Sequence, residues 1–108
     1  MTDREVQKYC ETVKKNIKRY SLKTMQEESK ASHTQFCMSS GALFHASCIA
    51  WDMKMDSEMD LSKEARHQLS GLEEWLKKEQ SILNSWHGSE TEESYADYRE
   101  RMEGKKDD

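Results

Sequence analysis

The sequence contains no proline and only four glycines among its 108 residues. Tight turns and helix kinks depend on these two residue types, so a sheet joined by hairpins is disfavoured. No apolar run is long enough to cross a bilayer, and the N-terminal residues are too polar for a signal peptide. Three cysteines are an odd number without the spacing of a disulfide framework. These absences predict a helical, cytoplasmic protein that has no membrane association.

Charge is distributed unevenly along the chain. Residues 1–23 carry seven Lys or Arg against three acidic residues, whereas residues 24–108 carry ten against eighteen, and the net charge is −4. An acidic total disfavours a dedicated duplex-DNA binder, because such proteins bind largely by neutralising phosphates. Only 34% of the residues are hydrophobic, so we expect a partner or a second copy to help complete the core.

Apolar residues spaced by three and four predict two helices in the first half of the chain. The first begins at a capping-box pattern, Thr2 with Glu5, and its apolar stripe runs to Tyr20. A turn is expected within residues 26–35; because no glycine or proline enforces it, the alternative is that the first helix runs straight on into the second. The second helix covers about 34–56, and its many small residues predict that it is the central, most buried helix. Its expected core face is Phe36, Ser40, Leu43, Phe44, Ser47, Cys48, Trp51 and Met55.

A third helix is the clearest element of the second half. Ser62 is placed to cap its start, and Gly88 is placed to stop it. Its expected core stripe is Leu61, Ala65, Leu69, Leu72, Leu76, Leu83 and Trp86. Its expected exposed faces carry Glu73, Glu74, Lys77, Lys78 and Glu79.

A short fourth helix is predicted after Gly88. The pattern Ser89 with Glu92 is a second capping box, and the helix is expected to end at Gly104. The fold class is therefore all-α: an antiparallel helical bundle of three main helices plus a short C-terminal helix. We expect a single helical domain over residues 1–104 and a charged tail over 105–108.

The second helix carries two histidines and two cysteines, the side chains that zinc prefers. The candidate ligands are His33, Cys37, His45 and Cys48. In one straight helix the two His/Cys pairs lie roughly 12–18 Å apart, so one ion would need a chain reversal or a second copy. We therefore favour no metal and no cofactor, with Cys37 and Cys48 as small buried groups. A zinc-stabilised helical module is the third alternative for function.

Two other groups of residues are candidates for contact with a partner. A basic block in the first helix could contact nucleic acid or an acidic protein surface, and it consists of Lys14, Lys15, Lys18 and Arg19. Aromatic residues commonly anchor protein interfaces, and the candidates here are Trp75, Trp86, Tyr95 and Tyr98. A solvated helix face and ordinary core packing are the simpler interpretations of the two groups.

No set of residues indicates catalysis. His45 and Cys48 could touch, but no third group orients the base and no glycine-rich element accompanies them. We expect a non-enzymatic, protein-binding accessory factor of the kind that phages and mobile elements encode as inhibitors of host enzymes. The alternative is a nucleic-acid-associated regulatory factor that uses the basic block. We also expect a homodimer through the first two helices, with Val13, Ile17 and Gly41 at the contact. The alternative is a monomer in which the third helix alone covers the apolar stripes of the first two.

Overall fold

A computed structural model describes residues 2–22 and 33–104, and within them every regular element is a helix. The elements are α1 (Asp3–Asn16), the π-helical η1 (Ile17–Leu22), α3 (His33–Met55), the 3₁₀ turn η2 (Ser57–Met59), α4 (Lys63–Gly88) and α5 (Tyr95–Gly104). The predicted all-α bundle with a short C-terminal helix is confirmed. The charged tail and most of the turn expected within 26–35 lie outside the described residues.

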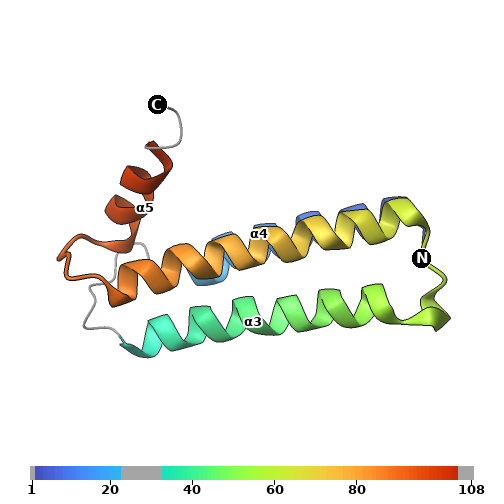
Figure 1. Cartoon of the computed structure of the whole chain (residues 1–108), viewed down its shortest axis with the longest axis horizontal. Helices are drawn as coiled ribbons and strands as arrows, with labels where there is room; N and C mark the ends of the chain where they lie inside the picture. Colours follow the sequence, from blue (N-terminus) through green and yellow to red (C-terminus); the bar gives the residue numbers. More distant parts are fainter. Residues whose placement is uncertain (1, 23–32, 105–108) are drawn as a thin grey trace.

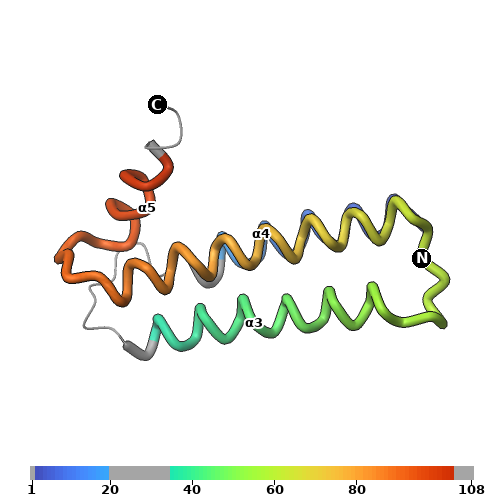
Figure 2. Tube along the Cα trace, viewed as in Figure 1, coloured from blue at the N-terminus to red at the C-terminus, as the bar shows by residue number. Residues whose placement is uncertain are grey.

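The helices are arranged around α4. Figure 1 shows α3 and α4 side by side and antiparallel, α1 behind α4, and α5 standing across the C-terminal end of α4. The chain trace in Figure 2 shows that α1 and α4 start at the same end of the molecule and run in the same direction. Because α4 contacts α1, α3 and α5, it is the central helix. The expectation that the second helix, α3, occupies that place is wrong.

Local capping explains where α1 and α4 begin. Thr2 and Glu5 form the predicted capping box, in which each side chain accepts a hydrogen bond from the other residue's backbone N–H. The hydroxyl of Ser62 accepts from the Ala65 N–H at 3.0 Å, as predicted for an N-cap. The same hydroxyl donates to the carboxylate of Asp3. The starts of α1 and α4 are therefore joined directly.

The fourth helix begins later than the sequence predicted. Ser89 and Glu92 do not form a capping box; instead, the Ser89 hydroxyl donates to the Trp86 carbonyl at 2.7 Å and finishes α4. The cap of α5 is Ser94, whose hydroxyl accepts from the Asp97 N–H at 3.2 Å. The intervening extended segment turns the chain so that Tyr95 packs on Trp86. Tertiary packing has overridden a local capping signal.

Most of the buried surface comes from α4. Its buried residues are Ala65, Leu69, Leu72, Leu76, Glu79, Leu83 and Trp86, so the predicted leucine stripe is confirmed. The exception is Glu79, which was expected on the exposed face and is only 3% exposed. From α3 the core receives Ser39, Leu43 and Ala50. Of the expected core face of this helix, only Leu43 is fully buried.

A candidate interaction surface on α3

The most unusual surface of the molecule is the outer face of α3. Every large apolar side chain that the described residues leave exposed belongs to this helix: Met38 is 63% exposed, Phe44 69%, Ile49 37%, Trp51 51% and Met55 62%. Three of them, Phe44, Trp51 and Met55, share one face of the helix and together present roughly 400 Å² of apolar surface. That area is within the range of the largest apolar patch on a soluble monomer, and such patches often bind a partner.

The same stretch of chain is also without charge. From His33 to Trp51 there is no Asp, Glu, Lys or Arg, in a sequence of which 35% is charged. Exposed helix faces of soluble proteins normally carry charged side chains. An apolar and uncharged face in contact with water is costly because its burial would be favourable. The composition of α3 therefore indicates a face that another surface covers.

α3 has two apolar stripes on nearly opposite sides. One follows Phe36, Ser39, Leu43, Ala46, Ala50 and Met53, and it packs on the core. The second, which we call the outer stripe, consists of Cys37, Gly41, Phe44, Cys48, Trp51 and Met55. All six members of the outer stripe are exposed, and they alternate by four and three residues, the spacing of a coiled-coil seam. The core face predicted from the sequence combined members of both stripes, and the burial pattern corrects this.

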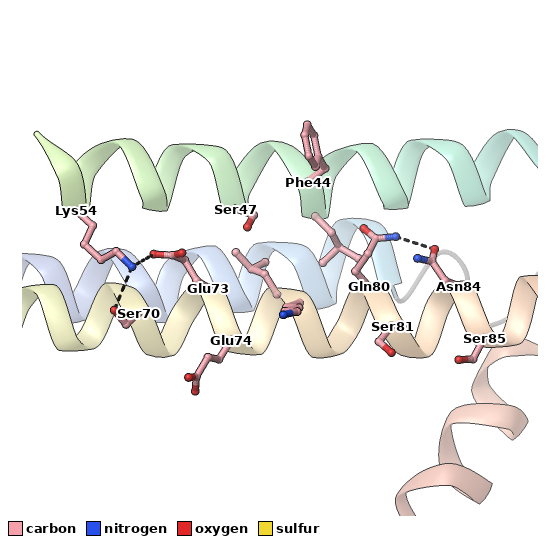
Figure 3. A pocket seen from close by; sticks show the side chains of 13 residues that line it. Phe44, Ser47, Lys54, Ser70, Glu73, Glu74, Gln80, Ser81, Asn84 and Ser85 are labelled. Carbon is pink, nitrogen blue, oxygen red and sulfur yellow. Dashed lines mark hydrogen bonds and ion pairs between the residues drawn. The ribbon is translucent and has the colours of Figure 1, made fainter.

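A groove between α3 and α4 borders the outer stripe. Figure 3 shows Phe44 pointing away from α4, while Ser47 and Lys54 point toward it. The groove floor is polar: Lys54 pairs with Glu73 at 2.8 Å, and the Gln80 amide donates to the Ser40 hydroxyl at 2.8 Å. These contacts fix α3 on α4. The outer stripe is thus presented by a rigidly held helix.

The structure alters the interpretation of the cysteines. Cys37 and Cys48 are exposed on α3, so the expectation that both are buried is wrong. Because α3 is one continuous helix, His45 and Cys48 lie too far along its axis from Cys37 for all of them to ligate one ion. The described residues contain no cluster of three or more metal-binding side chains. Cys10 is the buried thiol, and desolvation raises its pKa, which makes it a poor nucleophile.

The basic block forms one continuous surface at the end of α1 and in η1. The ammonium groups of Lys14 and Lys18 lie 5.9 Å and 5.7 Å from the centre of the Trp75 ring on α4. Together with Lys15 and Arg19, they line a shallow hollow. The hollow also includes Glu11, which offsets part of the positive charge. Two lysines occupy the face of Trp75, so the indole is not presented for stacking on a base.

The other three aromatic candidates belong to the core. Trp86 and Tyr95 are fully buried and Tyr98 nearly so, which leaves them no surface for a partner and corrects the expectation that they bind one. Trp86 packs edge-on against Tyr95, and its indole N–H donates to the Glu93 carbonyl at 2.9 Å. Burial raises the pKa of Tyr95 to about 12, so its phenol stays neutral at physiological pH. These contacts hold α5 on the end of α4.

The structure places the residues predicted for self-association in different environments. Ile17 is buried and Val13 packs against the core, because α1 lies on α4. Ile17 therefore has almost no surface left for a second copy, whereas Val13 is only partly buried. Gly41 is exposed, and a methyl group added to its α-carbon would meet nothing within 4 Å. It is one of the six residues of the outer stripe.

Comparison of the chain with protein-family models, with curated proteins and with solved structures finds no match. Among the helices that the structure describes, none combines the length and apolar character needed to span a membrane. The outer stripe of α3 is the surface that the sequence analysis missed. Its signal in the sequence was the uncharged stretch from His33 to Trp51.

Proposed function

We propose that this protein is a non-enzymatic accessory factor that acts by binding another protein through the outer stripe of α3. The observation that carries the proposal is that all the exposed large apolar side chains of the described residues lie on α3, the helix whose first nineteen residues, 33–51, lack charge. Large apolar side chains such as Phe44 and Trp51 are typical anchors of protein interfaces. An inhibitor that occupies a surface of an enzyme or complex would act through such a face.

Site-specific photo-crosslinking in the producing cells tests this proposal. A photoreactive phenylalanine analogue at position 44 is expected to form adducts with a protein other than this chain. The same analogue at the exposed Lys78 of α4 is the matched control and should form few adducts. Adding Trp51→Glu to the first variant should abolish its adducts, because a charge would be placed in the apolar contact. An absence of adducts at position 44, or equal yields at both positions, would contradict the proposal.

The basic surface supports a second candidate function, binding of a nucleic acid by charge alone. Four basic side chains gather at the end of α1 and in η1, and two of them are held over Trp75. Since the two lysines lie over the Trp75 ring, that ring face does not contribute by stacking on bases. Contacts to about four phosphates would give a slope near −3 for the logarithm of the affinity against the logarithm of salt concentration.

Charge reversal measures whether this second function exists. Replacing the four basic residues by glutamate should abolish low-salt binding of a single-stranded oligonucleotide, DNA or RNA, and with it the salt dependence. The variant carries Lys14→Glu, Lys15→Glu, Lys18→Glu and Arg19→Glu. A control with the same change in net charge reverses the exposed residues Lys63, Arg66, Lys77 and Lys78 of α4. An equal loss in the control, or no binding by the unaltered protein at low salt, would refute a role for the basic surface.

A further inference from the structure

We propose that, when no other protein is bound, the outer stripe is covered by a second copy of this chain, whose α3 lies antiparallel to the first. The inference rests on the proposed function in one respect: both assign binding to the same face of α3. It adds the partner, the direction of the two helices and the register. It also replaces the expected contact through the first two helices by a contact through α3 alone.

The order of large and small side chains in the outer stripe carries the inference. Three members are large, namely Phe44, Trp51 and Met55, and the remaining three are Cys37, Gly41 and Cys48. If Gly41 faces Trp51 of a second, antiparallel helix, the repeating spacing places Phe44 opposite Cys48 and Cys37 opposite Met55. Every layer then pairs a small residue with a large one, as close packing of two helices requires. Gly41, the smallest residue of the stripe, then packs against Trp51, the largest.

A parallel arrangement of the same helices would pack poorly. Gly41 would face Gly41 and leave a void, while Trp51 would face Trp51 and force the backbones apart. Cavities and overpacking both destabilise a contact. The antiparallel arrangement also sets the two helix dipoles in opposition, which is favourable. The stripe is thus complementary to itself in one direction only, and this property is what a twofold symmetric interface needs.

Charge and area agree with a second copy as the occupant. Near the symmetry axis the flanking residues are His45 and Ser47, so no acidic or basic side chain of α3 meets its own copy there. Apart from the exposed Asp52 near its end, the outer stripe has no charged neighbour on α3 with which to select a charged partner. Covering the roughly 400 Å² that the large members of the stripe present on each copy buries about 800 Å² in total, the size of a weak and transient interface. We therefore expect a dimer that dissociates at micromolar concentration.

Sedimentation equilibrium over a range of micromolar concentrations is the first test, and a mass approaching twice 12.7 kDa is expected. Gly41→Leu should raise the dissociation constant at least about 30-fold, because the added side chain fills the space for Trp51 on both copies. The monomer itself should tolerate the change, since nothing lies within 4 Å of the new group. Gly71→Leu on α4 is the matched control, at an equally exposed and open helix position, and should leave the dissociation constant unchanged.

Exchanging the large and the small residue at positions 51 and 41 tests whether these two positions face each other in the dimer. Trp51→Ala alone should weaken the dimer at least about 30-fold. Combining it with Gly41→Leu should recover at least about tenfold of that loss, because a large residue again faces a small one. The dimer affinity is expected to recover only if residue 41 of one copy faces residue 51 of the other. Failure of the double variant to improve on either single variant would overturn the register.

Disulfide trapping tests the direction. Phe44→Cys should give an oxidised dimer linked between residue 44 of one copy and Cys48 of the other, identified by peptide mass spectrometry. A parallel pair would instead link Cys48 to Cys48 in the unaltered protein, and that product would overturn the antiparallel arrangement.

The failures of the two proposals are distinguishable. A monomer at all concentrations, with photo-adducts from position 44 to a different protein, overturns the dimer and leaves the proposed function standing. A dimer whose dissociation constant is insensitive to Gly41→Leu and Trp51→Ala places self-association on another face and also overturns the inference. Photo-adducts of twice the mass of the chain, with none to other proteins, support the dimer and contradict binding of a different protein at this face.

Discussion

Replacing Trp86 by alanine is expected to lower the free energy of unfolding by about 3–5 kcal/mol, a large fraction of the stability of a domain of this size. The side chain is fully buried, and its ring centre lies 5.5 Å from that of Tyr95 in an edge-on contact. Truncation leaves a cavity between α4 and α5. It also removes the donor that the Glu93 carbonyl now has at 2.9 Å.

Urea denaturation followed by far-ultraviolet circular dichroism measures this loss, because the helix signal does not depend on tryptophan fluorescence. The matched control is Trp51→Ala, at a protein concentration where all variants are monomeric. Trp51 is 51% exposed, so its removal should cost less than about 1 kcal/mol. Trp86→Phe should fall between them, since it keeps a ring but loses the indole N–H. Equal losses for Trp86→Ala and Trp51→Ala would show that the buried aromatic contact is not what stabilises the fold.

Helix positions could be predicted from the sequence wherever the signal was local. The capping box at Thr2, the N-cap at Ser62 and the end of α4 at Gly88 all occur as predicted, because each depends on a few neighbouring residues. The start of α5 could not be predicted in this way. Ser89 offered an equally good local signal, and the packing of Tyr95 on Trp86 decided between the two.

The direction in which α3 faces could not be predicted, because the helix is apolar on both sides. Two stripes with the same spacing compete for the core, and the choice between them depends on which side meets α4. Leu43 and Phe44 are adjacent in the sequence, yet one is buried and the other is 69% exposed. The candidate site is therefore visible in the sequence as an excess of apolar residues without charge. Only the structure assigns it to the surface.

The role of Glu79 could not be predicted either, because its partner, Arg99, lies on a different helix. The guanidinium donates to both carboxylate oxygens of Glu79, one of them at 2.5 Å, and joins α4 to α5. The hydrogen bond to Glu79 raises the pKa of Arg99 above its ordinary value, so Arg99 stays positively charged at every physiological pH. A lone glutamate in a helix gives no sign of such a pairing, and the usual expectation of solvent exposure failed here.

Glu79→Ala is accordingly expected to destabilise the fold by about 3 kcal/mol, the lower end of the range for breaking a buried ion pair. The lower end applies because Arg99 is still 18% exposed and keeps Glu103 at 3.0 Å. Amide hydrogen exchange should show the loss first in α5, which this pair attaches to α4. Glu93→Ala is the control: it breaks a more exposed pair with Arg101 and should cost much less, because solvent screens exposed ion pairs.

Removing both charges should restore much of the stability that is lost when the Glu79 carboxylate alone is removed. In Glu79→Leu with Arg99→Leu, neither an unpaired carboxylate nor an unpaired guanidinium remains beside Tyr95, and apolar side chains of similar size fill the space. We expect the double variant to be at least about 1 kcal/mol more stable than Glu79→Ala when both are measured by urea denaturation. If the double variant is less stable than Glu79→Ala, the pair contributes net stability to the fold. If Glu79→Ala costs no more than Glu93→Ala, the attachment of α5 depends on the packing of Trp86 and Tyr95 alone.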